Sequence, residues 1–475
     1  MLFADVARYS AAMTRRTSLR PPETCAAARA ELEAAVAANP AIAFVDAAIS
    51  DICGNLRGKR LPIADAAKLF ESGMQIPLSL HLMDVRGEMM NPSGRGYTDG
   101  DPDGTAWPIP GTVMEIWGAD PPRAQLLTSL RDGSGAALSY DPRAVLERVL
   151  ARFAEFALTP VVAHELEFYL IDMKRDDRGR PLPPRSPRSG HRETTPSVYG
   201  IEDLDEYQAF LTALNEAAAM QRVPISTTSK EYAPGQFEAN LRHQTNALMA
   251  SDHAIFMRQI VKAAAASQGF QATFMAKPYV DRSGSGQHVH LSLADASGRN
   301  VFDNGTQEGS ELLRHAAGGL AAVMAESMAF FAPSTNSYRR FAPDMFAPVN
   351  RRWGVNNRTA GIRIPVSPDA ARRIEHRCAG ADANPYLILA AILAGVHHGL
   401  ANRLDPGPIA VGNVSREPDN ELPHSLEDAL KRLETAPVLP GYFGAEAVAL
   451  YRETKAEELA RFRKIITAEE HEWYL

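Results

Sequence analysis

The 475-residue sequence contains few cysteines, no long apolar run and no excess of basic residues. Its three cysteines, Cys25, Cys53 and Cys378, are too few for a disulfide framework and have no C-x-x-C spacing, which fits a reducing cytoplasm. We find no uninterrupted apolar run of 18 residues that would predict a membrane span. The formal net charge of -7 offers no general attraction for nucleic acid or anionic lipid. These absences favour a soluble, cytoplasmic protein that binds neither nucleic acid nor membrane.

The composition, with 45% hydrophobic and 23% charged residues, is typical of a globular enzyme large enough for two or three cores. Residues 1–23 lack an apolar core followed by a cleavage site, so we interpret them as a loose extension, or as the product of a start codon placed too far upstream. Residues 24–132 combine one helix with short strands and Gly/Pro-rich loops, which predicts a small α+β domain. Asp141 and Pro142 then mark a helix start, and we expect a larger second domain over residues 133–475.

The second domain is expected to mix helices with an antiparallel-looking sheet, which makes the fold α+β. Its periodicity predicts helices over 142–156, 203–221 and 245–268 and near 309–330, 385–403 and 444–468, with strands over 160–171, 270–276 and 287–294. The polar, basic and Pro-rich segment 175–196 is expected to be a loop. Two interpretations of this loop stay open: a solvated surface excursion, and a flap over an anionic substrate.

Acidic side chains recur where they can converge on one point. In HELEFYL (164–170), Glu165 and Glu167 share one face of an expected strand. Two carboxylates about 5 Å apart repel by roughly 3 kcal/mol at an effective dielectric near 20, so we expect positive charge between them. Taken alone, the motif is equally typical of a half-buried strand with a polar outer face. EYAPGQFE (231–238) adds Glu231 and Glu238 around a Pro-Gly turn that can bring both toward one point.

Two further segments add histidines and arginines to this set. SGSGQHVHLSL (283–293) places His288, His290 and Ser292 on one strand face, after glycines that permit close approach of a ligand to the backbone. RRIEHR (372–377) places Glu375 on the same face as two arginines, a pattern that is also typical of a solvated strand.

Together, these segments predict a metal site with arginines around it. Glutamates with a histidine form an oxygen-rich ligand set that suits two Mg²⁺ or Mn²⁺ ions. Planar guanidinium groups match carboxylate and phosphate oxygens, so arginines beside such ions indicate phosphoryl transfer with an acid substrate. The candidates are Arg339, Arg340, Arg358, Arg363 and Arg377.

The order of these motifs resembles the glutamine synthetase family over residues 40–475. The matching segments are HELEFYL, EYAPGQFE, TFMAKP, SGSGQHVHLSL, STNSYRR, NNRTAGIRIP, RRIEHR and ANPYL. Within the family, FVDAAISDICGNLRGKRLP and VVAHELEFYLID are similar to the γ-glutamylputrescine synthetases. The resemblance implies a small β-grasp N-terminal domain and a large catalytic domain whose curved antiparallel sheet is backed by helices. It also implies a homo-oligomeric ring, commonly a dodecamer, with active sites between neighbouring subunits.

The resemblance further implies roles for single residues. One metal ion would be held by Glu167, Glu231 and Glu238, and the other by Glu165, His288 and Glu375. The expected ligands of glutamate are Arg340, Arg377 and the backbone of Gly284, while Arg358 and Arg363 would take phosphate charge of ATP, and His290 and Ser292 would contact the nucleotide. The implied reaction transfers the γ-phosphoryl group of ATP to the side-chain carboxylate of L-glutamate, after which an amine displaces phosphate.

The sequence departs from ammonia-using members of the family at the expected amine site. Where they carry a glutamate, APDMFAP (342–348) places Phe346, whose ring can cover an alkyl chain and attract a cation by about 0.5–2 kcal/mol, unless it only packs the loop. Asp84 in HLMDVRG is expected near the amine. We therefore predict an ATP-dependent ligase that joins L-glutamate to putrescine or another small amine. An ammonia-using glutamine synthetase and a catalytically silent structural or nitrogen-sensing relative are the alternatives.

Overall fold

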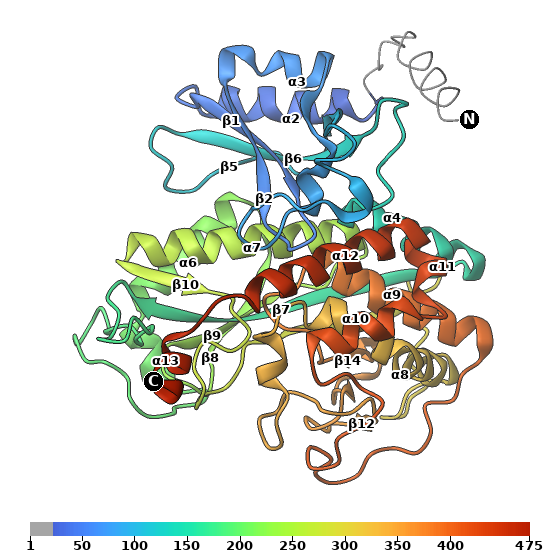
Figure 1. Cartoon of the computed structure of the whole chain (residues 1–475). Coiled ribbons are helices and arrows are strands. Elements are labelled where there is room, and N and C mark those ends of the chain that lie inside the picture. The colour runs from blue at the N-terminus through green and yellow to red at the C-terminus, as the bar shows by residue number, and fades with distance from the viewer. Residues whose placement is uncertain (1–21) are drawn as a thin grey trace.

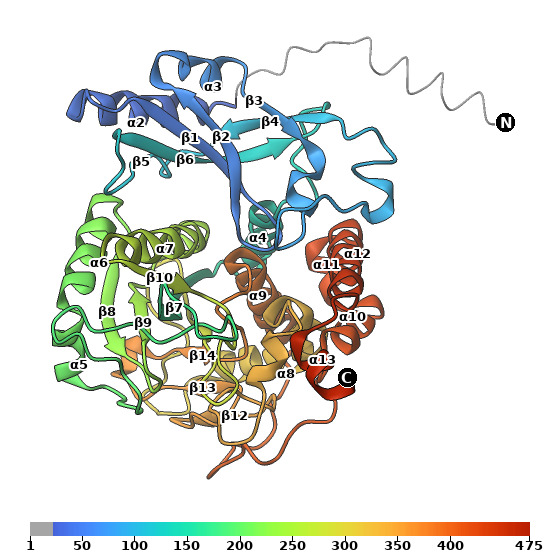
Figure 2. The same cartoon turned by 60° about the vertical axis from the view of Figure 1, so that its left-hand side comes forward.

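The computed structural model describes residues 22–475, so most of the expected N-terminal extension lies outside the described residues. A small sheet with two helices stands against a larger body of sheet and helices (Figure 1). Seen from a second direction, the small sheet faces α4, α7 and α12 of the larger body (Figure 2).

The N-terminal part is a six-stranded sheet in the order β2-β1-β6-β4-β3, with β5 beside β6. Strands β1 and β6 run parallel, and the other neighbours are antiparallel. The strands are β1 (Phe44–Ser50), β2 (Leu56–Pro62), β3 (Met74–Pro77), β4 (Asp103–Pro108), β5 (Met114–Glu115) and β6 (Arg123–Arg131), and the helices are α2 (Cys25–Ala38) and α3 (Ala67–Glu71). Helix α2 buries Cys25, Ala28 and Leu32, so the helix covers one face of this sheet as the α+β prediction requires.

The larger part is built on an eight-stranded sheet in the order β12-β13-β14-β11-β7-β9-β8, with β10 beside β7. Neighbouring strands are antiparallel except β12 and β13, which run parallel at one edge of the predicted antiparallel sheet. The strands are β7 (Thr159–Asp172), β8 (Ile225–Lys230), β9 (Gln236–Leu241), β10 (Phe270–Thr273), β11 (Gln287–Ala294), β12 (Trp353–Val355), β13 (Ile362–Ile364) and β14 (Ile374–His376).

Helices back this sheet and form the main core. They are α4 (Pro142–Ala151), α5 (Ile201–Glu206), α6 (Gln208–Met220), α7 (Ala247–Ser267), α8 (Glu311–Phe331), α9 (Pro385–Asn402), α10 (Leu426–Glu434), α11 (Leu439–Phe443), α12 (Ala445–Phe462) and α13 (Ala468–Tyr474). Helices α8 and α9 pack very closely, because a Cβ on Gly319 would come within 2.0 Å of the Gly395 carbonyl oxygen. By length and composition α9 could cross a membrane, but 83% of it is buried inside the protein, as in a core helix.

Four predicted elements differ in extent from the observed ones. The helix expected over 142–156 is α-helical only to Ala151, after which Arg152–Phe156 form a 3-10 helix. The helix expected over 203–221 is divided into α5 and α6 at Tyr207, whose fully buried ring packs edge-on against Phe237 at 5.1 Å. The strand expected over 270–276 ends at Thr273, and beyond it the Lys277 N–H donates to the Asn336 side chain at 2.8 Å. The helix expected over 444–468 ends at Phe462, and Thr467 caps the separate helix α13.

The predicted loop 175–196 contains neither a helix nor a named strand. Two ion pairs hold the C-terminal end of the loop. Arg192 pairs with Asp172 at 2.6 Å, and Glu193 pairs at 3.2 Å with Lys230, which is completely buried. Removing one partner of a buried ion pair destabilises the fold, because the other charge is left unpaired in a medium of low dielectric.

A second loop, residues 83–95 of the N-terminal part, is held along one face of α12. The Val85 N–H donates to Glu458 at 3.0 Å, and the Ser93 hydroxyl donates to Glu453 at 2.7 Å. Arg461 donates to Glu88 at 3.0 Å from the same helix face. The loop that carries Asp84 is therefore positioned by a helix that lies more than 350 residues further along the chain.

Candidate active site

The candidate site lies on one face of the larger sheet, at the adjacent strands β7, β9 and β11. Glu165 of β7 is directly opposite His288 of β11, and Glu167 is directly opposite Glu238 of β9. Because side chains alternate along a strand, Glu165 and Glu167 point to the same side, whereas Leu166 lies in the core with no exposed surface. The registers of three strands thus bring together acids that are far apart in the sequence.

Glu165 is the centre of this cluster. Its Oε1 atom lies 2.7 Å from Nδ1 of His288, and its Oε2 atom lies 3.0 Å from Nε2 of His290. Nδ1 of His288 is also 3.8 Å from Glu375, and Nε2 of His288 is 4.0 Å from Glu167. The ring therefore stands among three of the expected metal ligands.

Two groups of side chains have ligand atoms that all lie within 4.8 Å of one another. One group contains Glu165, Glu238 and His288, and the other contains Glu165, His290 and Glu375. Glu165 belongs to both groups, so these sets differ from the division between two ions that the family resemblance implies. His290, which the resemblance assigns to the nucleotide, here contacts an acid of the cluster.

The crowding of the acids shifts their pKa values in opposite directions. Burial and the charge of Glu231 raise the pKa of Glu167 to about 8, and burial and the charge of Glu165 raise the pKa of Glu238 to about 11. Burial acts in the same direction on Glu165, but hydrogen bonds from the two histidines outweigh it and hold its pKa well below the usual range. The protein alone thus leaves part of this cluster without compensating positive charge.

Arginines supply compensating charge at the edges of the cluster. Arg363 donates to Oε2 of Glu375 at 2.6 Å, and Arg377 donates to Oε1 of the same carboxylate. Although burial acts to raise the pKa of Glu375, the charge of Arg377 outweighs it and the pKa falls to about 2. Burial raises the pKa of Glu231, and the positive charge of Arg358 partly offsets that increase. The expected phosphate-binding arginines therefore lie beside the acids.

The glycine segment between β10 and β11 lies between Glu167 and Arg340. The Gly286 N–H donates to Oε2 of Glu167 at 2.8 Å. A Cβ on Gly284 would approach Cγ of Arg340 to 2.5 Å, so only glycine permits this packing. Arg340 is 3% exposed, and its Nη1 donates to the Cys378 carbonyl oxygen at 3.2 Å.

Gln236 and Arg373 also contact the cluster, although the motifs in the sequence do not predict a role for either. The Gln236 side chain donates to the Gly284 carbonyl oxygen at 3.0 Å and lies 3.4 Å from Oε2 of Glu167. Arg373 donates through Nε to Nδ1 of His290 at 3.2 Å. Each lies two residues from a predicted glutamate, and the strand period of two could have identified them.

The other predicted residues lie at the periphery. Ser292 follows His290 on β11 and is opposite Val161. Phe346 is 60% exposed, in a loop tied to Arg416 through Asp344 at 2.7 Å. The Asp84 carboxylate accepts the Arg86 and Glu88 N–H groups at 2.9 and 2.8 Å, beside α12. The carboxylate of Asp84 therefore bonds within its own loop, and its carbonyl oxygen accepts from Arg57 of β2 at 3.3 Å; neither partner belongs to the acid cluster.

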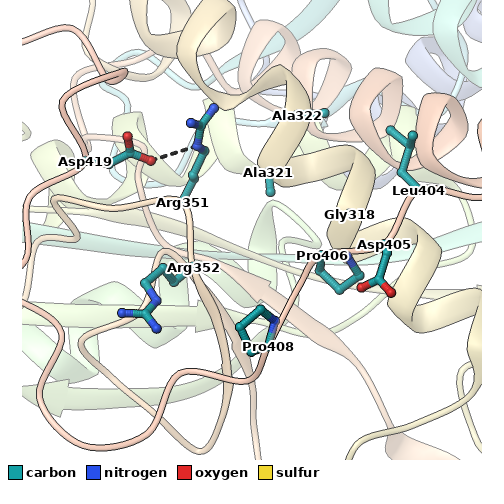
Figure 3. Close-up of a pocket in the computed structure, with 10 residues that line it drawn as sticks. All are labelled: Gly318, Ala321, Ala322, Arg351, Arg352, Leu404, Asp405, Pro406, Pro408 and Asp419. Atoms are coloured by element: carbon teal, nitrogen blue, oxygen red, sulfur yellow. Dashed lines mark ion pairs between the residues drawn. The ribbon is translucent and has the colours of Figure 1, made fainter.

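A surface hollow of about 400 Å³ lies elsewhere, between α8 and residues 404–408 (Figure 3). Its rim carries Arg351, which pairs with Asp419 at 2.7 Å, and its wall includes Gly318 and two prolines. None of the predicted site residues lines this hollow. The acid cluster is therefore the better candidate for the active site, because it brings together several predicted ligands with shifted pKa values.

The fold and the acid cluster define a class that comparison with known proteins confirms. A family model described as "Glutamine synthetase, catalytic domain" matches residues 139–474, and the chain belongs to the glutamine synthetase family. It is 39% identical over 437 residues to the Escherichia coli (strain K12) protein "Gamma-glutamylputrescine synthetase PuuA", covering 92% of each chain. It is 31% identical over 441 residues to "Glutamate--isopropylamine ligase" of a Pseudomonas species, covering 90% of this chain and 93% of the relative.

The similarity extends to solved structures. The structure "GmaS/ADP complex-Conformation 1" superposes with a TM-score of 0.79 at 28% identity, covering 93% of this chain and 98% of that chain. The ligand-free structure "Apo GmaS without ligand" has a TM-score of 0.78 at the same identity. The predicted glutamine synthetase fold is thereby confirmed.

Proposed function

We propose that the protein is an ATP-dependent ligase that joins the γ-carboxylate of L-glutamate to a small amine through a γ-glutamyl phosphate, with putrescine or another alkylamine as the substrate. The observation that carries this proposal is the cluster of acids and histidines on β7, β9, β11 and β14, with arginines at its edges. Relatives named as ligases of putrescine and isopropylamine support an amine rather than ammonia. We further propose a cytoplasmic location and two domains, residues 24–132 and 133–475.

The donor set fits two divalent cations. Two groups of carboxylate and imidazole atoms within 4.8 Å of one another provide the oxygen-rich ligands that Mg²⁺ and Mn²⁺ prefer. The raised pKa values of Glu167 and Glu238 support this assignment, because they indicate that the protein alone supplies too little positive charge to keep both carboxylates ionised. The residues that would hold the ions are Glu165, Glu167, Glu231, Glu238, His288 and Glu375. Bound ions of this kind neutralise phosphate charge and polarise the transferred phosphoryl group.

The remaining residues would bind and orient the substrates. Arg340 and the backbone of Gly284 lie side by side, so they can receive the α-carboxylate of glutamate, with Arg377 as a further ligand. Arg358 and Arg363 would stabilise charge that develops on the phosphoryl group, and His290 and Ser292 would face the nucleotide.

The amine must lose a proton before it attacks the acyl phosphate. For an amine with a pKa near 10, this costs about 4 kcal/mol at pH 7. We propose that Phe346 covers the alkyl chain of the amine, because its ring is 60% exposed and free to contact a ligand. The loop that carries Asp84, and not Asp84 itself, is held by α12, and the described hydrogen bonds of Asp84 do not reach the acid cluster. We therefore propose a homo-oligomeric ring, with a dodecamer as the expected form, in which this loop faces the site of a neighbouring subunit.

Phosphate release from ATP and glutamate, measured with a panel of amines and Mn²⁺, tests the proposal. We expect turnover that requires glutamate and an alkylamine together. Turnover with ammonia equal to that with the preferred alkylamine would instead support a glutamine synthetase, which Phe346 disfavours. No turnover with any amine, although Mn²⁺ and ATP bind, would support the silent relative.

A further inference from the structure

Gln236 occupies an unusual position within the site. It is the first residue of β9, it is 1% exposed, and it lies directly opposite Tyr169 of β7. Two residues further on, Glu238 lies opposite Glu167. Because the strand period is two, Gln236 faces the same side of the sheet as the acids. A buried amide in this position must make its hydrogen bonds within the site.

The Gln236 amide joins two parts of the site that have different proposed ligands. Its Nε2 atom lies 3.0 Å from the Gly284 carbonyl oxygen and 3.4 Å from Oε2 of Glu167. Its Oε1 atom accepts the Ala233 N–H at 3.3 Å. A primary amide has two N–H donors, so one can serve the glycine segment and the other the carboxylate. The side chain therefore connects Glu167, a proposed metal ligand, with Gly284, a proposed ligand of glutamate.

The backbone strengthens this connection on both sides. The Gln236 carbonyl oxygen accepts the Glu231 N–H at 2.9 Å, which fixes a second proposed metal ligand. The Gly286 N–H donates to the same Glu167 oxygen at 2.8 Å, while the Glu167 N–H donates to the Gly286 carbonyl oxygen at 3.0 Å. The Glu167 carboxylate thus contacts the segment 284–286 at both ends, directly at Gly286 and through the Gln236 amide at Gly284.

We propose that Gln236 is a positioning residue that couples divalent-cation binding at Glu167 to glutamate binding at Gly284 and Arg340. This inference rests on the proposed function. A cation that orders Glu167 fixes the acceptor of the Gln236 amide, and the amide then fixes the carbonyl of Gly284. The coupling is reciprocal, so bound glutamate strengthens cation binding by the same factor.

Titration calorimetry of the metal-free full-length protein tests the coupling. The dissociation constant of Mn²⁺ is measured with and without saturating glutamate, and that of glutamate with and without Mn²⁺. For each ligand, the ratio of its dissociation constant without the other ligand to that with it measures the coupling. In the unmodified protein we expect the two ratios to agree and to lie in the range of roughly 5–150-fold that is typical of coupled sites. Gln236→Met keeps the side-chain length but removes both donors. In this variant we expect both ligands still to bind, but the dissociation constant of each should be nearly the same with and without the other.

Two further variants separate coupling from a general loss of structure. Gln221→Met is the matched control, because Gln221 is 3% exposed at the end of α6 and contacts Met114, and we expect it to keep the ratio unchanged. Tyr169→Phe removes the hydroxyl that donates to the Ser283 carbonyl oxygen at 2.7 Å. This change loosens the same glycine segment but removes no hydrogen bond to Glu167. Glutamate should therefore bind more weakly, while the ratio of its dissociation constants without and with Mn²⁺ stays the same. If Gln236→Met does not fold, Gln236→Asn, whose shorter amide cannot reach both partners, replaces it with the same expectation.

The outcomes are distinct from those that test the proposed function. Two results would overturn the coupling while amine-dependent turnover remained intact. One is a ratio of dissociation constants, without and with the second ligand, that is the same in Gln236→Met as in the unmodified protein. The other is a ratio of one in the unmodified protein. Loss of Mn²⁺ binding in Gln236→Met would also overturn it, because the amide would then act on the cation site alone. An unmodified protein that binds neither Mn²⁺ nor glutamate would instead refute the proposed function itself.

Discussion

Binding of Mn²⁺ to the metal-free protein should release protons. Burial and a neighbouring carboxylate raise the pKa of Glu167 to about 8, so about nine-tenths of this group is protonated at pH 7. The pKa of Glu238 is raised to about 11, so this group is almost fully protonated at the same pH. A carboxylate that holds a cation must be ionised, and Glu165 and Glu375 already are. We therefore expect release of about two protons from Glu167 and Glu238 for each fully loaded site.

Calorimetric titrations with Mn²⁺ at pH 7 in buffers of different ionisation enthalpy measure this number directly. The apparent affinity should also fall as the pH is lowered from 7.5 to 6, because protons compete with the cation for the two carboxylates. In Glu238→Gln the release should drop by about one proton, since an amide does not titrate. Glu326→Gln is the control: this glutamate is buried on α8, and burial raises its pKa, but it accepts N–H groups of Val438 and Leu439 far from the cluster. Proton release near zero in the unmodified protein would refute the electrostatic interpretation of the site.

Three further predictions concern single side chains. Glu375→Gln leaves the buried guanidinium of Arg377 without its partner, so the free energy of unfolding should fall by about 3–5 kcal/mol, measured by urea denaturation. Phe346→Ala should change stability by less than about 0.5 kcal/mol, because the ring is exposed, while selectivity for an alkylamine over ammonia should fall by about 2- to 30-fold in kcat/KM. Lys230→Met leaves Glu193 unpaired, so limited proteolysis within residues 175–196 should become faster.

Each of these predictions has an outcome that would contradict it. An unchanged urea midpoint in Glu375→Gln would mean that the arginines are satisfied without the acid. Unchanged amine selectivity in Phe346→Ala would show that the ring only packs its loop. Proteolysis of Lys230→Met at the rate of the unmodified protein would show that the other contacts of the loop suffice. Lys174→Met, directly before the same loop and exposed, serves as the matched control for this last experiment.

The sequence predicted the faces of the strands better than the ends of the elements. The alternation in β7 placed Glu165 and Glu167 together because the strand period depends only on local geometry. The division of a predicted helix at Tyr207 was missed because its cause is the distant ring of Phe237, which no local pattern reports.

The candidate site shows the same limit. Motifs identified the acids, but the pairing of Glu165 with His288 depends on the register between strands more than one hundred residues apart. The strand period of two places Gln236 on the same face as Glu238, but its involvement was missed because an uncharged amide indicates no particular chemistry until its partners are known. The role of α12 in holding the loop 83–95 could not be inferred either, since the acids of α12 do not by themselves identify a distant partner.

The attachment of residues 83–95 to α12 also affects the order of events during translation. The loop emerges from the ribosome early, but Glu453, Glu458 and Arg461 are synthesised only after most of the chain. The small sheet can pair its strands as soon as they appear, because domains generally fold as units during synthesis. The loop that carries Asp84 acquires its contacts with α12 last, so we expect a nascent chain stalled before residue 445 to expose that loop to proteases.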